Sequence, residues 1–472
     1  MKLGQQSFVT FASKFGSSLL SFLSIVYFSR ILGPDALGIY FVVLAMLGWF
    51  NIVSGLTVKE ALTKRLSEME TNSGGLLSAA VLIQICLLSV TVVGIVYFKD
   101  YIDTYIGIEA TYLLILMLVV QSVLYLERGV LEGIGKVHVS GLLAPTSLVF
   151  ERGAQLVGVA LGLGVIALLG GYVVGVGITL IVGLIYISLS PRIPERHHFT
   201  SLVEYGKYNW VNAAEGRTLN NVDTLTLGYF VSSTFVGFYG VAWNVSSLLA
   251  LFGYAISQTL FPEISRRDSE KSDVGSLITD SLTYTGLLLI PGLVGGILIG
   301  ERILEMYGDA YVEAKTVLII LITARLIYNY HTQLSNSLNA LDRPDVVFNI
   351  NLKFISFNII LNIGLVYVLG WTGAAIATVS SSLLALLLSY RATARLVDFQ
   401  IPYRELLKQS VSAGLMAFVI LALQPVFSGT SVLFYRFVDT VVMVGVGAGV
   451  YFASLFWLSG DFRRKVIANV PI

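Results

Sequence analysis

The sequence predicts an all-α integral membrane protein of about 14 transmembrane helices, built as two parallel six-helix repeats with two further helices at the C-terminal end. Three observations predict this fold class. Of the 472 residues, 56% are hydrophobic and 12% are charged, and this charged fraction is about half that of a soluble domain. Apolar stretches long enough to cross a bilayer follow one another with only short polar gaps. Short sequence matches also recur roughly 200 residues apart.

The apolar stretches define the predicted spans, because a bilayer core of about 30 Å needs about 20 mostly apolar residues per helix. The first stretch begins near Ser7, is too long for the core of a signal peptide and lacks a small-residue cleavage site, so we expect it to be retained. The predicted spans are 8–30, 38–58, 77–97, 110–130, 141–164, 171–189, 205–231, 236–258, 280–299, 316–339, 346–368, 373–390, 408–425 and 434–458.

The charges in the connections predict the orientation of these spans. Cytoplasmic connections of membrane proteins carry an excess of Lys and Arg. With the N-terminus in the cytoplasm, most Lys and Arg residues of the connections fall on the cytoplasmic side. We therefore expect a multi-pass protein of the cytoplasmic membrane with both termini in the cytoplasm. The formal net charge of +1 argues against a nucleic acid partner.

The internal repeat consists of matches that keep the same order along the chain. Gly38-Ile39-Tyr40 recurs as Gly237-Phe238-Tyr239, and the segment 60–68 recurs, one residue shorter, as 263–270. Each copy holds about six spans, an even number, so both copies enter the membrane from the same side. We expect an N-terminal six-helix lobe at 1–190, a cytoplasmic linker at 191–204, a C-terminal six-helix lobe at 205–392, and two additional helices with a cytoplasmic tail at 393–472.

Ionisable residues within three of the predicted spans lie on polar stripes. Such residues cost at least about 2.5 kcal/mol each on insertion scales, so they usually face a cavity or a partner. The first span has a stripe of hydroxyl side chains centred on Lys14, the seventh has a stripe of Asn residues flanked by Arg217, and the tenth has a stripe that begins at Arg325. Lys14 and Arg217 lie at corresponding places in the two halves, as do Arg152 and Lys353.

These stripes predict a hydrated cationic cavity between the halves. Guanidinium groups bind phosphate oxygens through paired hydrogen bonds, so we expect an anionic, phosphate-bearing substrate. The candidate substrate-binding residues are Lys14, Arg152, Arg217, Arg325, Lys353, Asn212, Asn220 and Asn329, and the candidates for ion coupling are Glu215 and Asp223.

Each of these charges also has a structural interpretation. Glu151 and Arg152 could join two helices, Lys14 and Lys353 could extend to the inner interface, and Arg325 could bond a backbone carbonyl group. Arg217 and Arg325 lie too deep in their spans to reach the interface, which favours function for these two residues.

The sequence offers no metal or cofactor site, and we expect no cofactor. Cys86 is the one cysteine and lies within an apolar run. His197 and His198 have no cluster of Cys or carboxylate residues around them, so we interpret them as a solvated or headgroup-level pair. A Gly-x-x-x-x-Gly-Lys nucleotide loop is missing from the sequence, which excludes direct use of ATP by that route.

Three segments of the sequence resemble a known family. Ser29-Arg-Ile-Leu-Gly-Pro-Asp-Ala-Leu-Gly-Ile-Tyr40, Lys64-Arg-Leu-Ser-Glu68 and Leu131-Glu-Gly-Ile-Gly-Lys136 are similar to segments of polysaccharide-biosynthesis flippases of the multidrug/oligosaccharidyl-lipid/polysaccharide (MOP) exporter superfamily. The resemblance covers the whole chain in span count, repeat and the two extra helices. It implies transport of undecaprenyl- or dolichyl-phosphate-linked oligosaccharides by alternating access of two lobes. It also implies that Lys14 and, through the repeat, Arg217 hold the phosphate.

We therefore expect a flippase that moves a prenyl-(di)phosphate-linked oligosaccharide or sugar across the cytoplasmic membrane for polysaccharide or glycan biosynthesis, and not an enzyme. One alternative is a cation-coupled multidrug exporter of the same superfamily, which would need buried carboxylates as its main cavity charges. The other is a membrane glycosyltransferase or polymerase, which the short outer connections disfavour. The expected partners are the lipid-linked sugar and membrane lipids, and we expect a monomer.

Overall fold

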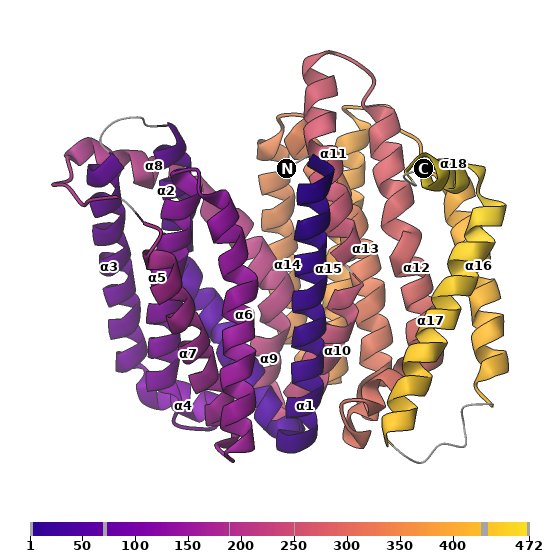
Figure 1. Cartoon of the computed structure of the whole chain (residues 1–472), viewed down its shortest axis with the longest axis horizontal. Helices are drawn as coiled ribbons and strands as arrows, with labels where there is room; N and C mark the ends of the chain where they lie inside the picture. The colour runs from indigo at the N-terminus through magenta and orange to yellow at the C-terminus, as the bar shows by residue number, and fades with distance from the viewer. Residues whose placement is uncertain (1–2, 69–72, 188, 250, 426–432, 470–472) are drawn as a thin grey trace. The chain divides into compact units, whose positions relative to one another are not determined.

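The computed structural model describes residues 3–68, 73–187, 189–249, 251–425 and 433–469, and of these it describes the side chains outside 3–15, 56, 207–213, 251–259, 433–435 and 468–469. The regular secondary structure of this part of the chain is helical throughout (Figure 1). The predicted all-α fold class is therefore confirmed. The chain forms two compact units, Met1–Gly240 and Val241–Ile472. The lobes and linker expected from the repeat stay a prediction, because compactness does not test a repeat.

The first unit holds the helices of the N-terminal half. They are α1 (Leu3–Asn51), the π-helix η1 (Ile52–Leu56), α2 (Thr57–Glu68), α3 (Ser73–Tyr97), α4 (Lys99–Ile106), α5 (Thr111–Gly133), α6 (Val137–Ala160), α7 (Gly164–Leu184), α8 (Arg196–Arg217), the π-helix η2 (Thr218–Val222), α9 (Asp223–Phe230) and the start of α10 (Ser233–Leu248). The helix α7 packs against both α6 and α5, and α5 also packs against α2. In Figure 1 these helices run lengthwise beside α3.

The second unit holds the rest of α10 and the helices that follow it. These are α11 (Leu251–Ser269), α12 (Gly275–Glu305), the 3-10 helix η3 (Asp309–Ala314), α13 (Lys315–Ala340), α14 (Pro344–Leu369), α15 (Trp371–Ala394), α16 (Tyr403–Leu423), α17 (Leu433–Leu458) and α18 (Gly460–Asn469). The helix α15 packs against α13 and α14, and α12 packs against α13, α16 and α17. Met416 of α16 and Met443 of α17 belong to an apolar core that these helices share with α12.

The first two predicted spans belong to one long helix with a sharp bend. Within α1 the backbone at Gly33 leaves the helical region, with φ 77° and ψ 177°. Glycine adopts a positive φ without steric cost. Pro34 follows at once, and its missing N–H would in any case interrupt the helical hydrogen bonds at this point. The Gly-Pro pair therefore separates the two predicted spans without a loop.

The helix α8 begins at Arg196, inside the segment 191–204 that the sequence predicts as a linker. Its first turn is closed by a capping box, in which the Glu195 backbone N–H donates to His198 Nδ1 at 2.9 Å. His198 is fully buried and its ring lies against Gly75 of α3. The interpretation of His198 as a solvated residue is therefore wrong, because the cap turns its ring inward. His197 remains exposed.

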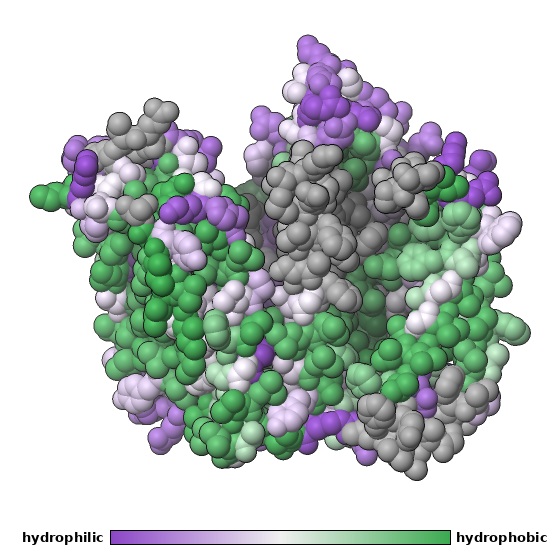
Figure 2. Space-filling model, in the orientation of Figure 1, coloured by the Kyte–Doolittle hydropathy of each residue, from purple (hydrophilic) through white to green (hydrophobic). Residues whose placement is uncertain are grey.

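The outer surface of the helices is apolar over much of its length. In Figure 2 hydrophobic side chains cover the middle of the helices in both units, and hydrophilic side chains gather near the helix ends. Nine helical stretches of the described residues are long and apolar enough to cross a membrane, and one of these, Gly16–Gly55, spans two predicted transmembrane helices. The protein is therefore a multi-pass membrane protein, and the count of 14 spans stays a prediction.

The repeated Gly-x-Tyr motifs form a contact with approximate two-fold character inside the first unit. A Cβ atom on Gly38 would lie 1.8 Å from the carbonyl oxygen of Ser233, and one on Gly237 would lie 2.0 Å from the carbonyl oxygen of Pro34. Gly38 thus lies against the backbone of Ser233, which is four residues before Gly237. Gly237 lies against the backbone of Pro34, which is four residues before Gly38. Ser233 Oγ also donates a hydrogen bond to the Asp35 carboxylate. The reciprocal pattern is what two copies of one repeat would produce at their mutual contact.

Candidate functional site

Arg152 lies on α6 at the centre of a buried polar network and is 7% exposed. Its Nη1 donates to Gln155 Oε1 at 2.6 Å and to the Tyr40 hydroxyl at 3.4 Å. Its Nη2 donates to Ser21 Oγ on α1 at 3.4 Å. Glu151 Oε1 lies 3.5 Å from Nη1, so a neighbouring carboxylate offsets the charge of Arg152.

The same network joins three helices of the first unit. Gln155 Nε2 donates to the Leu168 carbonyl oxygen of α7 at 2.7 Å and to Tyr40 of α1 at 3.2 Å. Gly175 allows the close approach of α7 to α6, since a Cβ there would lie 2.3 Å from the backbone of Glu151. Tyr40 is the tyrosine of the first repeated motif and is 1% exposed. These contacts favour a structural role for Arg152.

Arg217 is placed differently from Arg152. It is the last residue of α8, directly before the π-helix η2, and it is half-buried. Its guanidinium group lies against α1 at Gly48, where a Cβ atom would be 3.1 Å from Arg217 Nη1. Among the described residues no carboxylate lies within ion-pair distance of Arg217. π-bulges are frequent at functional sites, and here the bulge begins one residue after the cation.

Arg325 on α13 belongs to the second unit and is 8% exposed. Its guanidinium carbon lies 4.0 Å from the ring centre of Trp243, and its Nη2 donates to Ser247 Oγ at 2.6 Å. Both partners lie on α10. A desolvated cation over an indole face is stabilised by about 2 kcal/mol, so the ring holds the guanidinium group in a fixed plane. Trp243 and Ser247 are contacts that the sequence stripes did not indicate.

The other predicted cation and amide residues have varied positions. Asn329 is 7% exposed, and its Nδ2 donates back to the Arg325 carbonyl oxygen at 2.8 Å. Asn220 is exposed and its Nδ2 donates to the Gly216 carbonyl oxygen. Lys353 is exposed on α14. The side chains of Lys14 and Asn212 lie outside the described residues, although both backbones belong to helices, α1 and α8.

The two carboxylates proposed for ion coupling lie in the first unit beside η2. Asp223 is 2% exposed and accepts a hydrogen bond from the Tyr239 hydroxyl, which belongs to the second repeated motif. Glu215 is half-buried on α8. In both repeats the motif tyrosine therefore donates to a buried carboxylate, since the Tyr40 hydroxyl lies 3.4 Å from Glu151 Oε1. The sequence pattern gave the tyrosines but not these partners.

A further buried carboxylate was not predicted. Glu127 on α5 is 3% exposed, and neither of its oxygens has a hydrogen-bond partner among the groups that the structure describes. It lies one residue before Arg128, near the end of a predicted span, and its position therefore resembled that of an interfacial charge. Glu127, Glu151 and Asp223 are therefore buried carboxyl groups of the first unit, in which Arg152 is also buried.

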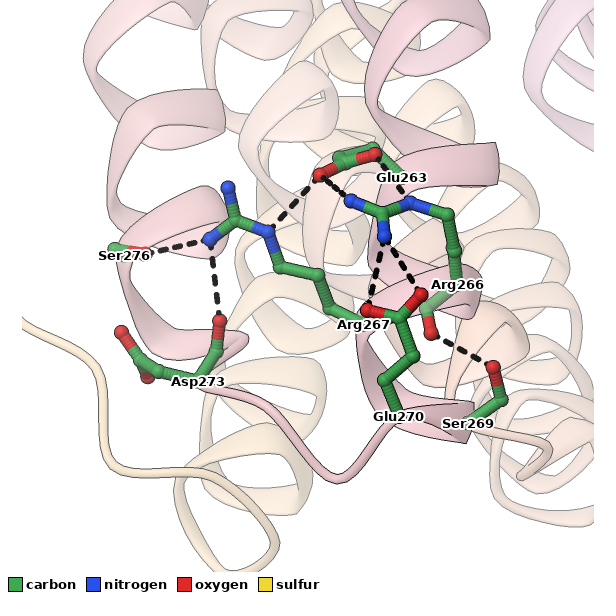
Figure 3. A network of polar contacts seen from close by, with 7 residues as sticks. All are labelled: Glu263, Arg266, Arg267, Ser269, Glu270, Asp273 and Ser276. Carbon is green, nitrogen blue, oxygen red and sulfur yellow. Dashed lines mark hydrogen bonds and ion pairs between the residues drawn. The ribbon is translucent and has the colours of Figure 1, made fainter.

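A cluster of surface ion pairs lies within the second repeated segment, 263–270, at the end of α11 (Figure 3). Glu263 Oε1 lies 2.7 Å from Arg266 Nη2 and 3.0 Å from Arg267 Nε, and Arg266 Nη1 also bonds Glu270 Oε1 at 2.7 Å. The two guanidinium groups lower the pKa of Glu263 to about 2. In the first copy, Lys64 and Glu68 of α2 pair at 3.0 Å. Both copies thus place paired charges on a helix that extends past a predicted span.

The described residues contain no group of three or more His, Cys, Asp or Glu side chains that could hold a metal ion. Each unit presents a buried or half-buried guanidinium group, Arg217 in the first and Arg325 in the second. Such groups bind phosphate, carboxylate or sulfate oxygens. The arrangement within each unit therefore fits binding of an anion better than it fits acid–base or metal chemistry.

Comparison with known proteins places the chain in a family. A model of the family described as "Polysaccharide biosynthesis protein" matches residues 27–316. The "Probable flippase AglR" of Haloferax volcanii is 32% identical over 98% of both chains. The "Probable low-salt glycan biosynthesis flippase Agl15" of the same organism is 30% identical over 89% of both.

Solved structures share the fold. A structure titled "Lipid II flippase MurJ, inward closed conformation" superimposes with a TM-score of 0.79 at 18% identity, covering 98% of this chain and 100% of that one. An inward-facing multidrug resistance MATE transporter of the MOP superfamily gives a TM-score of 0.63 at 13% identity, covering 80% and 94%. The likeness to these structures shows the fold alone. The family match and the full-length relatives together show that this chain belongs to the polysaccharide biosynthesis protein family.

Proposed function

We propose that the protein is a flippase that moves a prenyl-(di)phosphate-linked oligosaccharide or sugar across the cytoplasmic membrane for glycan or polysaccharide biosynthesis. The observation that carries this proposal is the full-length similarity, at 32% identity, to a protein whose name is probable flippase. A second relative of similar length has a name that joins flippase activity to glycan biosynthesis. A flippase moves its substrate without changing a covalent bond, so the protein is a transporter and not an enzyme.

The cargo has a part that the guanidinium groups can recognise. A prenyl-linked sugar carries its negative charge on the phosphate groups between lipid and sugar, and Arg binds phosphate oxygens with two parallel hydrogen bonds. We propose that Arg217 and Lys14 in the first unit and Arg325 in the second bind these phosphates, and that Asn220 and Asn329 contribute to the same function. Ring stacking on Trp243 and the hydrogen bond to Ser247 hold the Arg325 guanidinium group in place. A positioned group loses less entropy when it binds.

Lys353 and Asn212 remain proposed binding residues, as does Arg152 in a supporting role. Nη1 and Nη2 of Arg152 already donate hydrogen bonds to Gln155, Tyr40 and Ser21. It would therefore act on the cargo through the position of α1, which it joins to α6. Lys353 is exposed on α14.

A cation-coupled multidrug exporter is the alternative from the same superfamily, and it is less well supported. Both full-length relatives are named as flippases, whereas the exporters share only the fold at 13% identity. Asp223 is the carboxylate that an exporter would use, and it is occupied by the Tyr239 hydroxyl. We propose further that the protein resides in the cell membrane as a monomer with both termini in the cytoplasm.

The test is transport by the purified protein in proteoliposomes. A fluorescent prenyl-diphosphate sugar is placed in both leaflets, and a membrane-impermeant reductant reports the fraction that reaches the outer leaflet. We expect wild type to expose all of the label and the Lys14→Ala, Arg217→Ala double variant to expose only the half that starts outside. Arg266→Ala, which removes a surface cation from the cluster of Figure 3, is the control and should transport like wild type. Equal transport by the double variant would exclude the proposed role of these residues.

A further inference from the structure

Glu127 is a buried carboxyl group to which the proposed transport cycle assigns no role. It lies on α5 and is 3% exposed. Its Oε1 occupies the space left by Gly183 of α7, where a Cβ atom would lie 1.5 Å from that oxygen and 2.9 Å from Leu143 Cδ1 of α6. The carboxyl group is thus inserted between three helices, in a recess that requires a glycine.

Two other glutamates of the same unit show how a structural carboxylate is satisfied here. Glu132, five residues later on α5, lies 3.0 Å from Lys59 Nζ and accepts a 2.7 Å hydrogen bond from Ser140. Glu151 is bonded to Tyr40 and Gln155 and paired with Arg152. Neither oxygen of Glu127 has such a partner among the described groups.

Among the described residues, no charged side chain of the surrounding helices is bonded to Glu127. On its own helix Arg128 is adjacent in sequence, and its charge acts on Glu127 without an ion pair. From α2 the cation next to α5 is Lys59, which is held by Glu132. The described part of α3 contains no Asp, Glu, Lys or Arg residue. The other titratable or charged groups of the described elements that contact α5 make no hydrogen bond or ion pair with Glu127. They are Glu60, Lys64, Arg65 and Glu68 on α2, Cys86 and Tyr97 on α3, Lys99, Asp100, Tyr101, Asp103 and Tyr105 on α4, His138, Glu151 and Arg152 on α6, Tyr172 on α7, Tyr27, Arg30, Asp35 and Tyr40 on α1, and Tyr112, Tyr125 and Glu132 on α5 itself.

An ionised carboxylate in this recess would be expensive, because burial of a charge without a partner or hydrogen bonds is strongly unfavourable. A protonated carboxyl group is neutral and fits the apolar recess. A metal cation would need several further oxygen ligands, whereas Gly183 has no side chain and that of Leu143 is a hydrocarbon. The chemistry of the recess therefore selects a proton.

We propose that Glu127 is a proton-binding site coupled to the movement of α5 against α7. With the helices packed as they are here, the carboxyl group keeps its proton. When the helices separate, water reaches the recess, the O–H bond breaks, and the proton passes to water while its electron pair stays on the carboxylate. Coupling of this step to cargo movement rests on the proposed flippase function. Through Glu127, a proton gradient across the membrane could then supply energy for the transport cycle.

Infrared spectroscopy of the purified protein tests proton binding without any cargo. We expect wild type at neutral pH to show the carbonyl stretching band of a protonated carboxyl group, shifted in heavy water, and we expect Glu127→Gln to lack it. Glu132→Gln is the matched control, since it lies on the same helix but pairs with Lys59, and the band should persist there. A wild type without the band, or a band that survives in Glu127→Gln, overturns the proposal. The wild-type spectrum needs no variant, so misfolding of a variant would leave the proposal testable.

Transport under an imposed pH gradient tests the coupling. If one proton moves per cycle, a gradient of one pH unit shifts the equilibrium distribution of a prenyl-diphosphate sugar by up to about tenfold. We expect wild type and Glu132→Gln to show this shift and Glu127→Gln to transport without it. A shift retained by Glu127→Gln, or absent from wild type, refutes the coupling. If neither the wild type nor any variant moves the sugar, the flippase proposal fails. The infrared result still decides whether Glu127 binds a proton.

Discussion

Removal of Arg152 should destabilise the first unit strongly, because it would leave Glu151 as a buried charge without its partner. Both residues are less than 10% exposed, and Glu151 Oε1 lies 3.5 Å from Arg152 Nη1. At an effective dielectric constant of about 20, two unit charges at this distance attract by about 5 kcal/mol. Removing one partner of a buried pair typically costs about 3–5 kcal/mol. We therefore expect Arg152→Met to lower the free energy of unfolding by about 3–5 kcal/mol.

A double-mutant cycle separates the ion pair from packing. In Glu151→Gln, Arg152→Met no charge is left buried, so we expect the double variant to be more stable than Arg152→Met alone. The interaction energy from the cycle should be about 2 kcal/mol or more, within the range for residues in contact. Unfolding of the purified protein in mixed micelles, followed by circular dichroism, provides the four free energies. A loss below about 1 kcal/mol in Arg152→Met, or additive effects in the cycle, would refute the network described for Arg152.

Three further outcomes follow from the packing and the charges. Gly237→Ala should lower the melting temperature, because its Cβ would lie 2.0 Å from the Pro34 carbonyl oxygen. Gly177→Ala is the control: no atom lies within 4 Å of its Cβ, so the melting temperature should stay unchanged or rise. Equal melting temperatures of the two variants would contradict the close contact at Gly237. Burial, and then the neighbouring His197, lower the pKa of His198 below 6.5. Below pH 6.5 the unfolded chain therefore binds this proton and the folded chain does not, and the melting temperature should fall with pH more in wild type than in His198→Gln; parallel curves would show that the ring titrates freely. Arg266 and Arg267 lower the pKa of Glu263 to about 2. The contribution of Glu263 to folding stability is therefore complete above pH 4.5 and is lost as the pH falls from 4.5 towards 2. Glu263→Gln should flatten the decline of melting temperature over that range, and an unchanged decline would argue against the cluster.

The fold class could be predicted from the sequence because hydrophobicity alone determines it. Runs of about 20 apolar residues in a chain with few charges have no stable alternative to membrane-spanning helices. The repeated Gly-x-Tyr motifs were equally visible in the sequence. The structure gives a physical reason for their glycines, because backbone atoms of Ser233 and Pro34 lie where a Cβ atom of Gly38 or Gly237 would be. The sequence predicts a connection between the spans 8–30 and 38–58, and the structure has a bend at Gly33 and Pro34 there, because Gly and Pro favour both a loop and a kink.

The partners of the buried charges could not be predicted in the same way. Helical periodicity identifies which face of a helix is polar, but it does not identify which helix lies opposite. Trp243 over Arg325 and Tyr40 beside Arg152 depend on tertiary packing, and neither pair is close in sequence. Glu127 was missed for a related reason, since only the packing of α7 through Gly183 shows that the side chain points inward.

The central claim is that the protein binds a phosphate-bearing lipid through Arg217 and Arg325, and ligand-induced stabilisation tests it most directly. A ligand at 100 times its dissociation constant raises the free energy of unfolding by about 2.7 kcal/mol. We predict that a short-chain prenyl-diphosphate sugar raises the melting temperature of wild type, that the uncharged prenol and a lipophilic cation do not, and that Arg217→Gln with Arg325→Gln abolishes the rise. Stabilisation by the cation, or a rise with the prenyl diphosphate that persists in the double variant, would contradict the claim.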